Sequence, residues 1–176
     1  MNAALSPRVY RVLFLCTGNS ARSILAEVLT RQIGHGRFEA FSAGSQPRGE
    51  VHPMVLELLR GVGLPIEGLR SKGWNEFAAP DVPPMDFIIT VCDRAAGEVC
   101  PAWPGHPVTA HWSIPDPALT DGANKAAFRE VMFLLQQRIS LLTELKPESL
   151  DRLALRTRLE GLLPDADRVA DGDAPA

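Results

Sequence analysis

The chain has 176 residues, 45% of them hydrophobic, with 18 Lys and Arg against 21 Asp and Glu for a formal net charge of −3. This length suits about one domain of 100–200 residues. The slightly acidic balance argues against a nucleic-acid partner and against a polybasic membrane-surface protein. No apolar stretch reaches the roughly 18 residues of a membrane-spanning helix, and the N-terminus lacks the pattern of a secretory signal, so we expect a cytoplasmic location.

Hydrophobic patterning predicts strands and helices that alternate along the chain. In chain order these are a strand at 9–15, a helix at 23–33, a strand at 38–42, a helix at 53–62, a strand at 87–92, a possible short strand at 108–111, and helices at 123–145 and 149–163. The alternation predicts an α/β fold with a mainly parallel sheet. We expect a single domain over residues 1–163, with 147–163 as an extra C-terminal helical segment, and a disordered polar tail over 164–176.

The cysteine count indicates free thiols. Cys16, Cys92 and Cys100 are an odd number, and a reducing compartment disfavours structural disulfides. Free or catalytic thiols are therefore expected instead of a disulfide framework. No Cys/His cluster has the spacing of a zinc site, so no catalytic metal is expected.

The segment CTGNSARS, Cys16–Ser23, lies between the first predicted strand and the first predicted helix. Inward-pointing backbone N–H groups and a helix N-terminus would form an anion site there. Arg22 adds a planar fork that matches two oxygens of a tetrahedral oxyanion. The same positive field is expected to lower the pKa of Cys16, and Ser23 could hydrogen-bond the resulting thiolate. The alternative is a buried cysteine at a strand end, followed by an ordinary helix start.

The interior of this segment also fits a tight anion-binding turn. Gly18 permits a positive φ, and Asn19 is the next-best residue for a left-handed conformation. The expected oxyanion-binding residues are Thr17, Gly18, Asn19, Ser20, Ala21, Arg22 and Ser23.

CTGNSARS after an apolar strand resembles the low-molecular-weight protein tyrosine phosphatase superfamily. A second signature is Asp116-Pro117, within IPDPA. The resemblance implies a three-layer sandwich with a central parallel four-stranded sheet flanked by helices. It also implies that Asp116 lies over Cys16 and protonates the leaving oxygen as a general acid. Taken alone, an Asp before Pro is more commonly a turn residue.

A second set of residues resembles the arsenate reductases of this superfamily. These are TVCDRAAGEVCP at 90–101, HW at 111–112 and DPA at 116–118. Phosphatases of the fold usually carry aromatic residues after Asp-Pro, whereas Ala118 and Leu119 follow here. A small inorganic oxyanion suits such a site better. The resemblance thus implies reduction of arsenate to arsenite for arsenic detoxification, with phosphate or sulfate as competing oxyanions.

The resemblance further implies a thiol cascade. Cys16 attacks arsenate, Cys92 attacks Cys16 and releases arsenite, and Cys100 attacks Cys92 to leave a Cys92–Cys100 disulfide. Thioredoxin would reduce this disulfide, although a glutathione and glutaredoxin route stays open. No tightly bound cofactor is implied. The alternatives are a core cysteine at position 92 and a loop cysteine without a role at position 100.

One site departs from the family pattern. Some members bind potassium beside the catalytic loop, and Asn19, Glu27 and Ser42 match side chains of that site. The acidic residue that would complete it is replaced by Lys72, whose ammonium could occupy the cation position. The alternative is a solvated surface lysine.

Two other functions remain open. One is a low-molecular-weight protein tyrosine phosphatase that hydrolyses phosphate monoesters through a Cys16 phosphoenzyme. The other is a non-catalytic oxyanion-binding or thiol-sensing protein built on the same loop. The pair Cys92 and Cys100 favours the reductase over the phosphatase, and Arg22 with Asp116 argues against a non-catalytic role.

Overall fold

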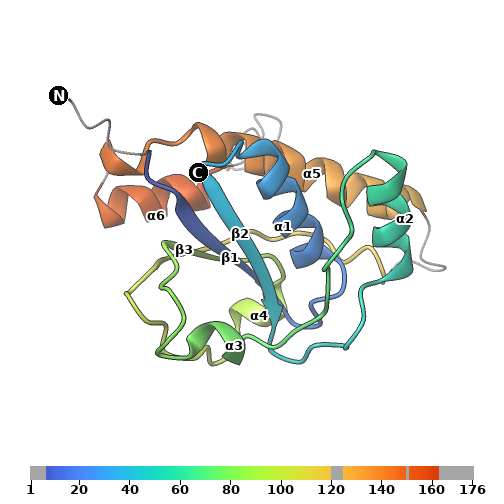
Figure 1. The fold of residues 1–176 in the computed structure, drawn as a ribbon, viewed down its shortest axis with the longest axis horizontal. Coiled ribbons are helices and arrows are strands. Elements are labelled where there is room, and N and C mark those ends of the chain that lie inside the picture. The colour runs from blue at the N-terminus through green and yellow to red at the C-terminus, as the bar shows by residue number, and fades with distance from the viewer. Residues whose placement is uncertain (1–6, 120–124, 150, 163–176) are drawn as a thin grey trace, which may run out of the picture.

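The structure is a computed structural model that describes residues 7–119, 125–149 and 151–162. Its centre is a sheet of four strands, all parallel and in the order β2-β1-β3-β4 (Figure 1). The strands are β1 (Tyr10–Cys16), β2 (Phe38–Gly44), β3 (Phe87–Thr90) and β4 (Val108–His111). This confirms the predicted α/β fold, its parallel four-stranded sheet, and the short fourth strand at the predicted residues.

β1 lies inside the sheet because both of its faces are apolar. Val12 and Phe14 belong to the larger buried cluster, whereas Leu13 and Leu15 belong to a smaller one on the other face. This alternation is the period-two pattern of a strand covered on both sides. Cys16, at the carboxyl end of β1, pairs with Gly44 of β2.

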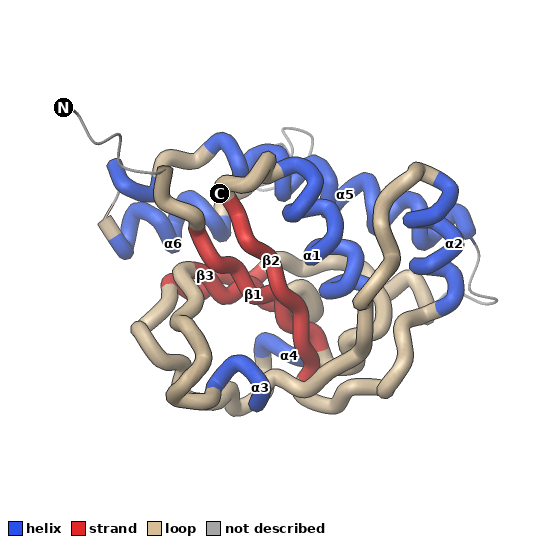
Figure 2. Tube along the Cα trace, in the orientation of Figure 1, coloured by secondary structure: helices blue, strands red, loops and turns tan. Residues whose placement is uncertain are grey.

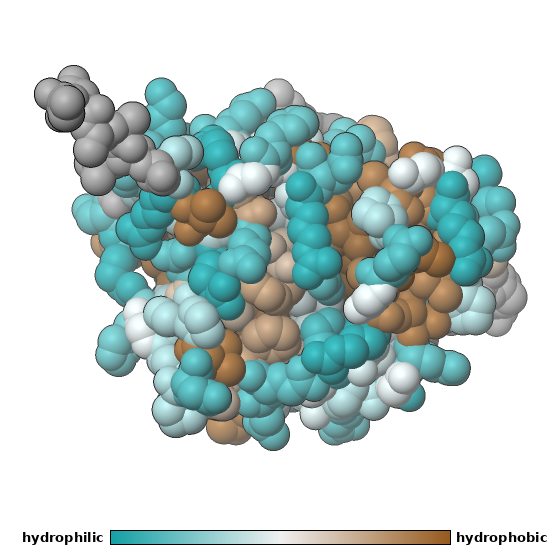
Figure 3. Space-filling view, in the orientation of Figure 1, coloured by the Kyte–Doolittle hydropathy of each residue, from teal (hydrophilic) through white to brown (hydrophobic). Residues whose placement is uncertain are grey.

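Helices cover the two faces unequally (Figures 1 and 2). On one side α1 (Arg22–Ile33) packs between the sheet and α5 (Lys125–Glu144), with α2 (Pro53–Gly61) beside α5. On the other side the layer is thinner: α3 (Asn75–Ala78) and long connecting segments bring Trp74, Phe77 and Trp103 onto the smaller cluster. In the view of Figure 3, apolar surface gathers over α2.

The C-terminal part packs on the edge strand. A 3₁₀ turn, η1 (Pro147–Ser149), precedes α6 (Arg152–Glu160), which contacts β4. The indole N–H of Trp112 donates to the carbonyl of Leu159 at 2.9 Å. Asp151 caps α6 by accepting from the N–H of Ala154 at 2.8 Å.

Several boundaries differ from the sequence predictions. β3 ends at Thr90 instead of 92, because Cys92 becomes the N-cap of a one-turn helix, α4 (Asp93–Ala96). No helix was predicted at these residues. The helix predicted at 149–163 is shorter and begins at Arg152. The predicted tail at 164–176 lies outside the described residues, as do residues 123 and 124 of the helix predicted at 123–145.

None of the helices in the described part of the chain has the length and apolar character needed to cross a membrane.

Candidate active site

The loop between β1 and α1 lies at the carboxyl edge of the sheet and packs tightly against the end of β2. A Cβ on Gly44 would lie 2.5 Å from the carbonyl oxygen of Thr17, so only glycine fits opposite Cys16. Asn19 takes the left-handed conformation, with φ 42°. Gly18 does not use the positive φ that it permits, so within this loop Asn19 takes the left-handed conformation, and its side chain makes the hydrogen bonds described below.

The carbonyl groups of this loop face outward. Those of Thr17, Gly18 and Ser20 accept hydrogen bonds from the N–H groups of Gln46, Arg48 and His52, each at 2.9 Å. With these carbonyls satisfied outside, N–H groups of the loop are left to point toward Cys16. The N–H of Asn19 donates to Cys16 Sγ at 3.1 Å. This polarity is the one that an anion site requires.

Ser23 and Asn19 hold the Cys16 sulfur, which is buried. Asn19 Nδ2 donates to Ser23 Oγ at 2.9 Å, and Ser23 Oγ lies 2.9 Å from Cys16 Sγ. Since Ser23 Oγ already accepts from Asn19, its own hydrogen is available for the sulfur. The structure thus provides two donors to Cys16, the Asn19 N–H and the Ser23 hydroxyl.

Burial nevertheless raises the pKa of Cys16, and the hydrogen bonds from Ser23 and Asn19 offset this only in part. The expected lowering of this pKa was wrong, because the removal of the buried sulfur from water outweighs these hydrogen bonds. The guanidinium of Arg22 is held by two other groups of the site. Arg22 Nη1 donates to the carbonyl of Ile114 at 3.0 Å, and Nη2 lies 3.3 Å from Asp116 Oδ2.

Asp116 comes from the loop after β4, and its Oδ1 accepts from the N–H of Ala118 at 3.0 Å. Asp116, Arg22 and Cys16 line one narrow cavity of about 30 Å³. That cavity adjoins a cleft of about 700 Å³, because Gly18, Arg22, Arg48 and Asp116 line both. The three residues on which the phosphatase resemblance rests therefore share one cavity.

Cys92 lies on the adjoining cleft. As the N-cap of α4, its Sγ accepts from the N–H of Ala95 at 3.4 Å. The same sulfur is 3.7 Å from the hydroxyl of Thr17, the residue after Cys16. Cys92 is buried, so the structure brings a second buried thiol to the Cys16 loop.

Cys100 lies apart from both. It is exposed, and it lines a separate pocket of about 360 Å³ whose walls include Trp103, His111 and Arg156. Partial loss of water contact around the sulfur and the nearby Glu98 carboxylate raise the pKa of its thiol. All three cysteines are free thiols.

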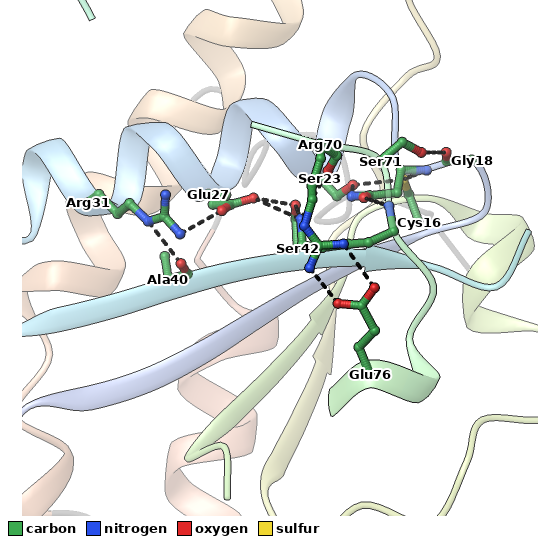
Figure 4. Close-up of polar contacts among 12 residues, drawn as sticks. Cys16, Gly18, Ser23, Glu27, Arg31, Ala40, Ser42, Arg70, Ser71 and Glu76 are labelled. Atoms are coloured by element: carbon green, nitrogen blue, oxygen red, sulfur yellow. Dashed lines mark hydrogen bonds and ion pairs between the residues drawn. The ribbon is translucent and has the colours of Figure 1, made fainter. Parts of the chain in front are cut away.

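Lys72 is buried beside Glu27 and Ser42, so the alternative of a solvated lysine is wrong. Its Nζ lies 3.3 Å from Ser42 Oγ, 3.7 Å from Glu27 Oε2 and 3.1 Å from the carbonyl of Arg70. Ser42 donates to Glu27, which lies between Ser42 and Arg31 (Figure 4). Burial lowers the pKa of Lys72, and Glu27 opposes that shift.

This cluster reaches the catalytic loop directly. The N–H of Lys72 donates to Asn19 Oδ1 at 2.8 Å, and Asn19 in turn donates to Ser23 and Cys16. The four residues expected at a cation site, Asn19, Glu27, Ser42 and Lys72, therefore form one connected group. In residues 7–119, 125–149 and 151–162, this cluster included, no three His, Cys, Asp or Glu side chains gather into a group that could hold a metal ion.

Two features of the site were missed from sequence. Arg48, in the segment after β2, lines both the cavity and the cleft. His111 connects β4 to α4: its Nδ1 lies 2.7 Å from Thr90 Oγ1 and its Nε2 lies 2.9 Å from Asp93 Oδ1. The HW pair had been noted, but without a role for the histidine. A basic residue in a turn carries no signal of its own.

The sequence pattern of the low molecular weight phosphotyrosine protein phosphatase family matches residues 11–152. The chain belongs to this family. Within the family it is similar to an arsenate reductase of Halalkalibacterium halodurans, with 32% identity over 136 residues that cover 76% of this chain and 94% of the relative.

Solved structures agree with this family assignment. The arsenate reductase of Archaeoglobus fulgidus has a TM-score of 0.61 and 30% identity, over 75% of this chain and 98% of that one. A thioredoxin-dependent arsenate reductase of Corynebacterium glutamicum has a TM-score of 0.57 and 29% identity, over 78% of this chain and 62% of that one. The family match ends where α6 begins, so this helix lies beyond the matched residues.

Proposed function

We propose that this chain reduces arsenate to arsenite, with Cys16 as the nucleophile and with Cys92 and Cys100 carrying the oxidation outward. The position of Cys92 carries the proposal: its buried sulfur contacts Thr17 at 3.7 Å and lines the cleft beside the Cys16 cavity. Hydrolysis of a phosphate ester needs no second thiol there, whereas reduction does. Similarity to arsenate reductases over most of the chain supports the same conclusion.

Binding comes first. Arsenate enters the cavity with its oxygens toward the loop N–H groups and the Arg22 fork. Arg22 exchanges its contact with Asp116 for the oxyanion, which leaves the Asp116 carboxyl beside the departing oxygen. Phosphate and sulfate have the same tetrahedral shape, so both compete for this site.

Three exchanges then follow. The Cys16 thiolate attacks arsenic, an S–As bond forms, and an oxygen leaves as water with a proton from Asp116. The Cys92 thiolate next attacks Cys16 Sγ: the S–S bond forms, the S–As bond breaks, and its electron pair stays on arsenic. Arsenic falls from the +5 to the +3 state and leaves as arsenite, while two thiols are oxidised to one disulfide.

In the last exchange the Cys100 thiolate attacks Cys92 Sγ. A Cys92–Cys100 disulfide forms and Cys16 leaves as a thiolate, ready for the next arsenate. Because Cys100 is exposed and Cys16 is buried, only this last disulfide is easily reached by a reducing protein. A dithiol partner of the thioredoxin type would then reduce it in the cytoplasm, where such reductants keep thiols reduced.

Lys72 has a positioning role in this proposal. Its side-chain ammonium supplies the positive charge between Glu27 and Ser42, and its backbone N–H fixes the side chain of Asn19. A bound potassium ion is then unnecessary for the shape of the loop.

The test is arsenite release by the purified protein with thioredoxin, thioredoxin reductase and NADPH. A parallel reaction contains glutathione, glutaredoxin and glutathione reductase. We expect arsenate-dependent NADPH oxidation with thioredoxin, and none with the Cys16→Ser variant. Hydrolysis of p-nitrophenyl phosphate without arsenite release under either condition would contradict the proposal and favour the phosphatase alternative. Activity in the glutaredoxin arm alone would keep the reductase but replace its partner.

A further inference from the structure

We propose that Arg48 is a second anion-binding guanidinium, which captures the dianionic substrate at the mouth of the Cys16 cavity and passes it to Arg22. The identity of the substrate rests on the proposed function, whereas the anion site itself rests on the geometry that follows. The sequence motif at residues 16–23 accounts for one arginine only.

Arg48 is anchored to the loop that it serves. Its backbone N–H donates to the carbonyl of Gly18 at 2.9 Å, and the Ser71 hydroxyl donates to the same carbonyl at 3.2 Å. Ser71 Oγ also accepts from the N–H of Gly49 at 3.1 Å. The backbone on both sides of the Arg48 side chain is thus fixed relative to Gly18.

The Arg48 side chain lies across Gly18. A Cβ built on Gly18 would be 3.1 Å from Arg48 Nε and 3.3 Å from its Cγ. The absence of a side chain at position 18 therefore lets the guanidinium approach the loop. From this position Arg48 lines both the narrow cavity of Cys16 and the wider cleft in front of it.

Arg48 also differs from Arg22 in its charge balance. Arg22 is engaged by Asp116 and by the carbonyl of Ile114. By contrast, the Arg48 side chain has no ion pair or hydrogen bond with any described residue. An arriving dianion must compete with Asp116 for Arg22, but meets no competitor at Arg48. The charge of Arg48, at the mouth of the cavity, can therefore receive the anion without breaking an existing contact.

The rest of the cleft gives a matched comparison. Arg94 lines the cleft as well but not the cavity. Asp93 is the other carboxylate of the cleft, and it accepts from Ser113 and is bonded to His111. Because Arg94 does not reach the cavity, it should only add to the positive field of the cleft. Arg48 lines the cavity itself and should contact the anion directly. Its planar fork suits two oxygens of a tetrahedral ion.

Arg48→Gln tests the proposal, with Arg94→Gln as the cleft control and Arg60→Gln, on α2, as a distant control. Binding of inorganic phosphate to the reduced protein is measured by titration calorimetry at two salt concentrations, and steady-state arsenate reduction separately. We expect Arg48→Gln to weaken phosphate binding about tenfold and to raise the KM for arsenate similarly, because a charged hydrogen-bonding partner is lost. The kcat should stay within about twofold, since Arg22 and Asp116 remain.

Arg48→Lys should recover part of the affinity, and salt should weaken binding to Arg48→Gln less than to the unmodified protein. Unchanged phosphate affinity in Arg48→Gln, or a loss equal to that in Arg94→Gln, would overturn the proposal. Phosphate titration needs no turnover. A protein that binds phosphate through Arg48 but releases no arsenite would therefore keep this inference and refute the proposed reaction.

Discussion

The loop around Cys16 is held from every side, whereas the segment from Cys92 to Cys100 is held mainly at its start. Loop carbonyls accept from residues 46, 48 and 52, and Asn19 is fixed by Lys72. In the second segment, α4 has one turn, Cys100 is exposed and Val99 is 94% exposed. This difference fits the proposed roles of the two parts. The Cys16 loop must keep a fixed shape to bind an anion, whereas Cys100 must reach both Cys92 and an external reductant.

The fixed part also explains why Cys16 needs help to ionise. Rigid enclosure removes its sulfur from water, and this raises its pKa. In the proposed reaction, substrate binding would draw Arg22 away from Asp116 and bring its charge into the cavity.

The largest effect is expected at the fixed end. Cys16→Ser should abolish arsenite release, because a hydroxyl is a poor nucleophile where only a thiolate is activated. Arg22→Lys should lower kcat/KM by about a hundredfold or more, because a point charge cannot replace the two-pronged contact. Arg60→Lys is the matched control. Coupled NADPH oxidation measures all three, and measurable reduction by Cys16→Ser would contradict the assignment of the nucleophile.

At the movable end, the two thiols should fail at different stages. Cys100→Ser should release one arsenite per enzyme and stop with a Cys16–Cys92 disulfide, since no third thiol accepts the oxidation. Cys92→Ser should release none. Both variants should keep slow hydrolysis of p-nitrophenyl phosphate, which needs only Cys16, Arg22 and Asp116. A rapid-quench assay of arsenite counts the first turnover, and equal bursts from the two variants would contradict this order.

The raised pKa of Cys16 predicts a specific pH dependence. Below that pKa the thiolate fraction falls about tenfold per pH unit. The rate of the first chemical step should therefore rise with pH through neutrality and continue to rise above the ordinary range of a thiol. Single-turnover rates at arsenate concentrations well below saturation report the pKa of the free protein and therefore measure this dependence. A rate that is constant from weakly acidic to weakly alkaline pH would show an already ionised Cys16.

Lys72 should affect stability and potassium dependence, because its cluster holds Asn19 of the Cys16 loop. Lys72→Met leaves Ser42 and one side of Glu27 without their cation, which should cost about 1–3 kcal/mol in the free energy of unfolding. Arg31 still pairs with Glu27 and limits the loss. Potassium should have little effect on the unmodified protein, while Lys72→Asp should make its activity depend on potassium. Denaturant unfolding and activity with and without potassium check this, and a strong potassium effect on the unmodified protein would oppose it.

The smallest effect concerns the start of α4. His111 and Ser113 hold the Asp93 carboxylate, and these hydrogen bonds lower its pKa. A lowered pKa means that this contact stabilises the fold above the ordinary pKa of an aspartate and is lost as the pH falls toward the lowered one. His111→Ala should therefore speed amide exchange in α4 and leave the Cys16 loop unchanged. Thr109→Ala is the control, and unchanged exchange in α4 would count against this tether.

The sequence predicted the parts that depend on local pattern. The apolar runs gave the parallel sheet, and the Cys16–Ser23 spacing gave the loop between β1 and α1. The one-turn helix α4 escaped because its N-cap is a cysteine sulfur, which is not a usual capping group.

The remaining differences needed the three-dimensional arrangement. The pKa of Cys16 is raised mainly by its burial, and Arg22 pairs with a residue 94 positions later. No local pattern of the sequence contains either feature. Arg48 likewise reaches Gly18 only because β2 lies beside β1. The placement of Lys72 beside Glu27 was predicted only through the family resemblance, because the spacing of these two residues along the chain corresponds to no local structural pattern.

The central claim is that oxidation starts at Cys16 and ends as a disulfide between Cys92 and Cys100. Reduced protein is treated with one equivalent of arsenate without a reductant, alkylated, digested and mapped by peptide mass spectrometry. The account predicts one arsenite per chain, a disulfide between Cys92 and Cys100, and Cys16 alkylated as a free thiol. Finding Cys92 and Cys100 both as free thiols after arsenite release would contradict it.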